Sequence, residues 1–255
     1  TLTLSGNNTY TGTTRVNTGT LQVNTVTMIG NLINDALVIW DQLTAEDDIT
    51  YGGDISGSGA LHKTGAGTLR LLGTNTYTGG TTVTAGTLEG NTDSLQGAFV
   101  NNAAVVFDQS FNGTYAGAMS GTGSLTKSGG GTLTLTGANS YLGGTFVNGG
   151  TLVGNTSSLQ GVISTNATLV FNQTTNGTFN GALSGSGSIQ KLGAGTLTLE
   201  GQHGFTGTTF VNAGALRLNA YLAGSLEVAN QARVSGVGYI AGNTTINGTH
   251  APGDP

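Results

Sequence analysis

An internal repeat of about 64 residues limits the folds that this chain can adopt. The related segments GTLRLLGTNTYTGGTTVTAGTLEG, GTLTLTGANSYLGGTFVNGGTLVG and GTLTLEGQHGFTGTTFVNAGALRL begin at Gly67, Gly131 and Gly195. An earlier copy opens the chain and carries three extra residues around LTAEDDITYGGD. We therefore divide the sequence into copies 1–67, 68–131, 132–195 and a divergent 196–255. A repeat of this length is typical of units that stack on their neighbours to close a shared core.

The local pattern within each copy favours short β-strands. Glycine, which weakens helices, contributes 46 of the 255 residues. Segments such as Leu133-x-Leu135 alternate apolar and polar residues, which is the period of a strand. One copy contains about nine apolar segments, or three coils of three strands. We predict an all-β fold: a single right-handed parallel β-helix over 1–255, with about 21 residues per coil and roughly twelve coils.

Aliphatic and aromatic residues recur at fixed offsets between copies. In a stacked solenoid such residues would form columns, and we expect aromatic side chains to stack on aromatic side chains. Two of the aromatic sets are Trp40, Phe107 and Phe171, and Tyr51, Tyr115 and Phe179.

Composition removes several other classes of protein. Charged residues make up 7% of the chain, against about 25% in ordinary domains. The absence of cysteine excludes a disulfide scaffold and a thiolate metal site. No apolar run approaches the ~18 residues of a transmembrane helix. Seven basic residues and a net charge of −5 argue against a nucleic-acid partner.

The segment GSLTKSGGGTLTLTGANSYLGGTFVNGGTLVG, which runs from Gly123 to Gly154, resembles the passenger-associated transport repeat of bacterial autotransporters. The ordered elements Lys-x-Gly-x-Gly-Thr-Leu, Asn-x-Tyr and Gly-Gly-Thr carry the resemblance. It implies a β-helical passenger segment of a longer protein, exported through the periplasm and outer membrane of a Gram-negative bacterium to the cell surface. The pattern fades beyond Ala215, which suggests a transition toward a C-terminal cap.

The resemblance also implies a function. Such repeats form a stalk and promote export, and passengers take part in adhesion, self-association, biofilm formation and virulence. The implied partners are other copies of the chain on neighbouring cells, a host glycan or matrix protein, and the protein's own C-terminal β-barrel outside this chain. An alternative is a stalk for a protease, esterase or toxin activity located outside this segment.

We expect no catalysis in this chain and no cofactor or metal. Its histidines, His62, His203 and His250, have no adjoining nucleophile or metal-binding motif. Paired acids of the kind that glycosidases need do not recur: Asp108 aligns with Asp41, but the next copy has Asn172.

An acidic stretch in the first copy is the sharpest local feature. Carboxylates bind cations, and insertions in a solenoid often form binding surfaces. We treat this stretch as a candidate interaction loop, with a solvated bulge as the simpler interpretation. Its members are Asp41, Glu46, Asp47, Asp48 and Asp54.

Lys63, Lys127 and Lys191 occupy the same position in three copies. With three coils per repeat they would form one column, about 14 Å apart. The simpler interpretation is solvated turn residues, and the functional one is a basic stripe that meets an anionic glycan or acidic groups of a neighbour.

Overall fold

The structure, a computed structural model, describes residues 1–6, 8–23 and 28–253, and all their regular elements are β-strands. None of these described residues forms an apolar helix long enough to span a membrane. The chain separates into two compact units. Unit 1 comprises Thr1–Gln109, Gly113–Thr126 and Ser140–Gly143, and unit 2 comprises Ser110–Asn112, Lys127–Asn139 and Gly144–Pro255. We describe each unit by itself, and one continuous helix over 1–255 stays a prediction.

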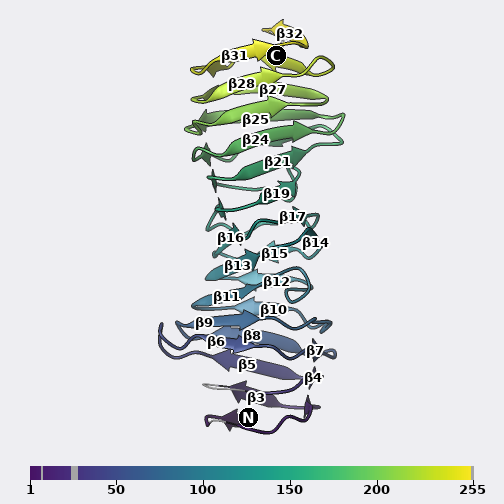
Figure 1. Cartoon of the computed structure of the whole chain (residues 1–255), viewed down its shortest axis with the longest axis vertical. Coiled ribbons are helices and arrows are strands. Elements are labelled where there is room, and N and C mark those ends of the chain that lie inside the picture. The colour runs from purple at the N-terminus through teal and green to yellow at the C-terminus, as the bar shows by residue number, and fades with distance from the viewer. Residues whose placement is uncertain (7, 24–27, 254–255) are drawn as a thin grey trace. The chain divides into compact units, whose positions relative to one another are not determined.

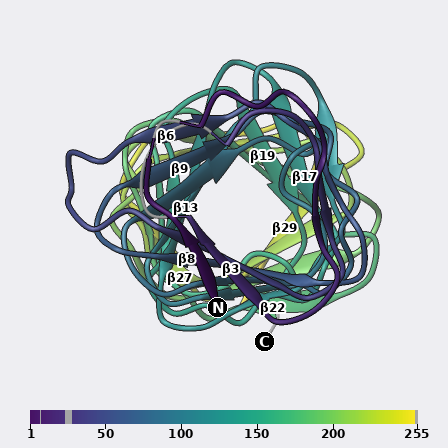
Figure 2. The same cartoon turned by 90° about the horizontal axis from the view of Figure 1, so that it is seen from below.

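Unit 1 is a coil of short strands whose hydrogen-bonded neighbours are never consecutive along the chain (Figure 1). Every described strand pair is parallel, which defines a parallel β-helix. Seen from the N-terminal end, the purple chain winds clockwise as it recedes, which is the right-handed sense (Figure 2). The first sheet contains β1 (Leu2–Leu4), β3 (Thr20–Val23), β5 (Leu37–Asp41), β8 (Ala60–Thr64), β10 (Thr81–Val83), β12 (Phe99–Asn101) and β15 (Met119–Ser120). The others hold β6 (Ile49–Tyr51), β9 (Thr68–Leu71), β11 (Thr87–Gly90) and β13 (Ala104–Asp108), then β2 (Thr14–Val16), β4 (Leu32–Asn34) and β7 (Ile55–Ser56), with β14 at Gly113–Tyr115.

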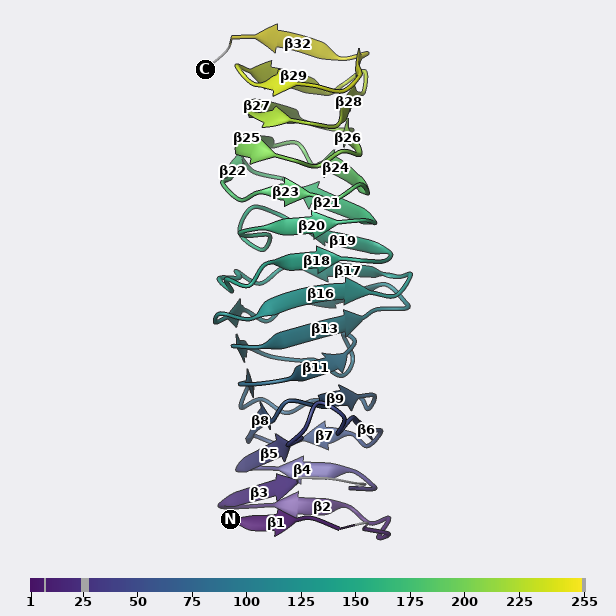
Figure 3. The same ribbon diagram turned by 90° about the vertical axis from the view of Figure 1, so that its left-hand side faces the viewer.

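Unit 2 has the same construction. One sheet contains β17 (Thr132–Leu135), β19 (Thr151–Gly154), β21 (Thr168–Asn172), β24 (Ser188–Leu192), β26 (Thr208–Val211), β28 (Ser225–Val228) and β31 (Thr244–Ile246). A second contains β22 (Gly177–Phe179), β25 (Thr196–His203), β27 (Ala215–Leu222), β29 (Arg233–Gly236) and β32 (Thr249–Pro252), which lie one above the other in Figure 3. The short β30 (Tyr239–Ile240) also pairs with β27. The third contains β18 (Thr145–Val147), β20 (Ile163–Thr165) and β23 (Leu183–Ser184), and β16 spans Ser124–Ser128.

Strand alternation builds the core of each unit. In β17 the side chains of Leu133 and Leu135 are buried while the two threonines face outward. Leu133 pairs with Leu152, and Leu152 pairs with Leu169, so aliphatic residues form columns from coil to coil. Burying one such side chain is worth about 1.5–3 kcal/mol. No coil has an apolar face of its own large enough to be stable, so stability depends on neighbours.

The coil is shorter than the sequence analysis predicts. Thr132, Thr151, Thr168 and Ser188 are successive register partners, so coils here take 19, 17 and 20 residues. The mean is about 19 residues, with about 13 turns in the chain, rather than 21 and twelve. A 64-residue copy therefore contains slightly more than three coils. Accordingly β25, the equivalent of β17 one copy later, lies in a different sheet of unit 2.

The two aromatic sets meet each other instead of stacking each on its own kind. Trp40 and Tyr51 have ring centroids 5.0 Å apart, Phe107 and Tyr115 5.2 Å, and Phe171 and Phe179 5.3 Å. Each contact joins two strands of one copy in the core. Tilted or edge-on pairs of this kind add about 0.5–1.5 kcal/mol beyond the area they bury.

Candidate functional site

The repeated lysines are buried, which corrects their interpretation as solvated turn residues. Lys63, Lys127 and Lys191 have no exposed surface. In unit 2, Lys127 on β16 and Lys191 on β24 lie in different sheets, because a copy is longer than three coils. The three residues therefore do not form a basic stripe.

Each of these lysines ties two coils together through backbone carbonyls. The Lys191 ammonium donates to the carbonyls of Leu192 (2.9 Å) and Gly193 (2.8 Å) in its own turn, and of Ala213 (3.0 Å) in the following coil. Lys63 contacts Thr64, Gly65 and Ala85 in the same way, at 2.7, 2.8 and 3.2 Å. An ammonium has three N–H donors, so these bonds satisfy it completely.

Burial lowers the pKa of Lys63 to about 8, an effect that the charge of Asp41 opposes. Burial likewise lowers the pKa of Lys191 to about 8. Because these pKa values lie above 7, both ammonium groups are mainly charged at neutral pH, and the carbonyl dipoles stabilise that charge. We call this arrangement the lysine lock; it explains the Lys-x-Gly turn of the repeat.

The acidic residues of the first copy do not gather into one site. Asp41 accepts hydrogen bonds from Gln22 (3.0 Å) and Thr64 (2.9 Å) on neighbouring strands. Asp54 accepts from the backbone N–H of Thr74 at 2.7 Å. Within the described residues, no group of three or more His, Asp or Glu side chains could hold a metal ion.

The inserted loop, residues 42–48, closes on itself. Asp47 accepts from the Thr44 N–H at 2.8 Å, while Glu46 is exposed. Asp48 accepts from the Thr68 N–H at 3.0 Å. Asn112 and Asn176 make the same bond to Thr132 and Thr196 in later copies, so Asp48 occupies a structural position of the repeat.

A buried asparagine bridges coils in the second and third copies. Asn75 accepts from the Ile55 N–H (2.8 Å) and donates to the Ser94 carbonyl (2.7 Å). In the third copy, Asn139 donates to the Ser158 carbonyl at 2.9 Å. The last copy has His203 here, whose Nδ1 accepts from the Leu183 N–H at 3.3 Å.

The Ser158 carbonyl, which accepts the hydrogen bond from Asn139, belongs to a tight turn that the last copy lacks. In the third copy, Asn155 accepts from the Ser157 N–H through Oδ1 (2.8 Å) and from the Leu159 N–H through its carbonyl (2.8 Å). Gly154 precedes the turn, and a Cβ there would lie 2.5 Å from Ser158 Oγ. The last copy has Leu218 at the position of Gly154.

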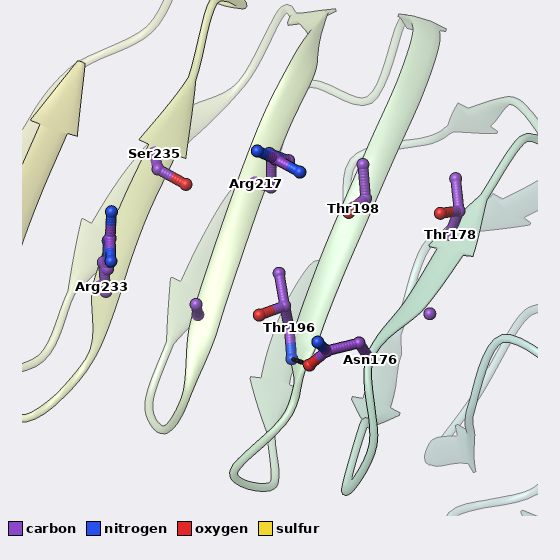
Figure 4. Close-up of a pocket in the computed structure, with 9 residues that line it drawn as sticks. Asn176, Thr178, Thr196, Thr198, Arg217, Arg233 and Ser235 are labelled. Carbon is purple, nitrogen blue, oxygen red and sulfur yellow. Dashed lines mark hydrogen bonds between the residues drawn. The ribbon is translucent and has the colours of Figure 1, made fainter. Parts of the chain in front are cut away.

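Because this turn is missing, β25 and β27 continue as eight-residue strands and pair along their whole length. Their outward residues form a broad polar face in unit 2 (Figure 4). Thr178, Thr198, Arg217 and Ser235 lie side by side in register across four strands. A shallow groove follows this row, lined also by Asn176, Thr196 and Arg233.

The same face continues toward the C-terminal end of β27. Asn219 donates to Glu200 at 2.9 Å. Beyond that pair, Tyr221 stacks on Tyr239 with centroids 5.9 Å apart and ring planes 12° apart. Both tyrosines are exposed, by 38% and 65%. These residues are not among the candidates predicted from the sequence, although charged and aromatic residues in the outward strand positions of a divergent copy are a usable signal.

Comparison with known proteins gives the family. The passenger-associated transport repeat family matches residues 1–23, 61–89, 125–153 and 189–218. The chain is 37% identical over 177 residues to the adhesin BmaC autotransporter of Brucella suis biovar 1 (strain 1330), covering 53% of this chain and 5% of that protein. It is 36% identical over 73 residues to an extracellular serine protease of Serratia marcescens, covering 28% of this chain and 7% of that protein. No solved structure matches the chain.

The three later family matches each enclose a lysine lock and the strand that follows it. The family motif therefore coincides with the device that joins one coil to the next. The chain spans only a small part of the length of these relatives. It is a secreted or cell-surface segment of a Gram-negative bacterium. The four matched repeats and these relatives support an autotransporter passenger that contains passenger-associated transport repeats.

Proposed function

We propose that this segment is a stalk that promotes its own export and that adheres to surfaces or to other copies of itself, without catalysis of its own. The lysine lock is the observation that supports the proposed role in export. The Lys191 ammonium is satisfied only when the following coil supplies the Ala213 carbonyl. Each new coil therefore stabilises the one before it, and folding can advance in one direction along the chain.

Directional folding outside the cell would bias transport through the periplasm and outer membrane, because a folded coil cannot slip back through a narrow pore. The test is a secretion assay of the whole passenger with Leu226→Asp, which places a charge in the core near the C-terminal end. Ser225→Asp, on the same strand but partly exposed, is the matched control. Loss of surface display in the first variant alone supports the proposal, and equal display of both contradicts it.

Adhesion or self-association is the second part of the proposal. Its support is the row of outward threonine, serine and arginine groups in unit 2 and the similarity to a protein named as an adhesin. Sedimentation velocity of the purified chain, from micromolar to near-millimolar concentration, tests self-association. Dimers that depend on concentration and salt support it, whereas a monomer throughout contradicts it.

A protease, esterase or toxin activity of the whole passenger would lie outside this segment. The similarity to a protein named as a serine protease is the observation that favours this alternative. Deleting the segment should then reduce display without changing the specific activity of the enzyme part.

A further inference from the structure

The cations of this chain are distributed unevenly among its faces. Three of the seven are the buried lysines. Arg15 lies 3.0 Å from Asp35 and Arg70 lies 2.9 Å from Glu89, both in salt bridges. The other two, Arg217 and Arg233, also have interaction partners, and they lie on the neighbouring strands β27 and β29.

The register places these arginines close together. Arg217 is opposite Ser235, and Arg233 is opposite Ala215, so their Cα atoms are diagonal neighbours about 8 Å apart. Hydroxyl groups of Thr198 and Ser235 flank them in the groove of Figure 4. Each guanidinium presents five N–H donors in a fork that fits a carboxylate or sulfate.

The exposed aromatic pair lies on the same sheet face. Tyr221 is four residues beyond Arg217 on β27, which places the two side chains about 13 Å apart along the strand. Tyr221 and Tyr239 present ring surface to solvent, and Val237, two residues before Tyr239 in the sequence, is 71% exposed. An aromatic face is electron-rich and attracts the weakly positive C–H groups of a sugar ring.

We propose that this face of β25, β27, β29 and β30 binds an acidic glycan. A carboxylate or sulfate would lie between Arg217 and Arg233, and a neighbouring sugar ring would pack on Tyr221 and Tyr239. The Glu200–Asn219 pair lies between the arginines and the tyrosines and offers hydrogen-bond partners for sugar hydroxyls. The Glu200 carboxylate disfavours a ligand that is negatively charged along its whole length, such as a nucleic-acid strand. Nucleic acid fits poorly, because strong binding there needs many phosphate contacts and the chain carries a net charge of −5. This inference rests on the proposed adhesive function and names its ligand class.

The experiment measures binding of three probes to the whole 255-residue chain by titration calorimetry. The probes are a heparin hexasaccharide, a hyaluronan hexasaccharide and the neutral chitin hexasaccharide. We expect binding of one or both acidic probes, weaker with added salt, and no binding of the neutral one. Equal binding of all three would overturn the proposal, as would equally tight binding of a short DNA duplex or no binding of either acidic probe at millimolar concentration.

Variants locate the site. Arg217→Gln combined with Arg233→Gln should weaken binding by about tenfold or more and reduce its salt dependence. Tyr221→Thr should weaken binding about fivefold and leave the salt dependence unchanged. Arg70→Gln, an outward arginine in unit 1, is the matched control and should bind as the parent does. Parent-like binding by both the double arginine variant and Tyr221→Thr, with circular dichroism unchanged, would contradict the assignment.

A cell-clumping assay with the same variants separates this inference from the proposed function. If the parent clumps cells but binds no acidic probe, the glycan face is wrong and adhesion by another surface stands. If the parent neither clumps cells nor binds the probes, both proposals are wrong.

Discussion

The third copy, 132–195, and the last copy, 196–255, have related sequences but build one corner differently. In the third copy the chain turns at Asn155 after Gly154, and Asn139 of the preceding coil bridges to the Ser158 carbonyl. In the last copy the corresponding segment continues as β27 to Leu222. The difference follows from Leu218, which stands where the turn has no room for a side chain.

The comparison shows how a repeat protein obtains a distinct surface without an added domain. The equivalent strands β17 and β19 of the third copy end after four residues, whereas β25 and β27 of the last copy, in another sheet of unit 2, are twice as long. The core of the last copy differs little from that of the third, because His203 replaces one bridging asparagine. The exposed surface differs more, because four further outward positions become available on β25 and β27.

The largest effect should come from the lysine locks, one of which joins the third copy to the last through the bond from Lys191 to the Ala213 carbonyl. Lys191→Met removes the ammonium and leaves three carbonyls without a donor, which should cost about 3 kcal/mol of unfolding free energy. Lys127→Met should cost a similar amount, since its lock also includes the Gly129 and Gly149 carbonyls. Urea unfolding followed by circular dichroism measures both. Arg70→Met, partly exposed, should change stability by less than about 0.5 kcal/mol, and an equal loss there would contradict the lock.

Gly154→Leu imports the residue of the last copy into the third. We expect a loss of about 2 kcal/mol, because a side chain there meets Ser158 and Leu159 at 2.5 and 2.7 Å. Gly130→Ala is the control, since its Cβ would meet nothing within 4 Å. Thermal unfolding of the two variants compares them, and equal midpoints would disprove the steric explanation of the corner.

Asn139→His places the histidine of the last copy at the bridging position of the third copy. It should cost about 1.5 kcal/mol, because the Ser158 carbonyl loses a buried donor. The reverse change, His203→Asn, should cost less than this, because the last copy has no equivalent turn to bridge. Denaturant midpoints of the two variants measure these losses. A larger loss in the last copy would mean that the bond from the Leu183 N–H to His203 stabilises the chain more than the asparagine bridge does.

Acid should weaken the last copy selectively. Burial lowers the pKa of His203 below its usual value of 6.5. Below about pH 6.5 the unfolded chain takes up this proton first, so stability is complete above that pH and falls as the pH drops toward the lowered folded value. Unfolding measurements at pH 7.5 and 5 should show a loss in the parent that His203→Asn reduces. An unchanged pH dependence in that variant would assign the loss to other groups.

The smallest effect should come from the inserted loop. Asp48→Asn keeps the bond to the Thr68 N–H that Asn112 and Asn176 make in other copies, so stability should change by less than about 0.5 kcal/mol. Asp48→Ala should cost about 1 kcal/mol. Calorimetric unfolding of both measures this difference. A loss of binding or self-association in Asp48→Asn would support the prediction that the loop is an interaction site.

The parallel β-helix could be predicted because periodicity and composition both indicate it. Leucines at matching offsets between copies, as at Leu88 and Leu152, indicate stacked units, and the glycine content excludes helices. The coil length could not be predicted as well. The apolar segments show where strands lie, but they do not show that the 64-residue copy ends one strand later than the third full coil.

The lysines show a different limit of sequence reasoning. A lysine in a glycine-rich turn is usually solvated, and its burial depends on three carbonyls, one of them from the next coil. No local pattern predicts that contact. The candidate face was missed for a related reason: Arg217 and Tyr221 look unremarkable in sequence and acquire meaning only beside Arg233 and Tyr239.

Hydrogen exchange of the two corners, followed by mass spectrometry on the parent chain, distinguishes an extended β27 from a turn at this position. Residues 219–223 should exchange as slowly as the rest of β27, because that segment pairs with β25. Residues 155–158, which form an isolated turn, should exchange faster. Equally fast exchange in both segments would show that the last copy turns as the others do, and it would remove the extended face on which the proposed glycan site depends.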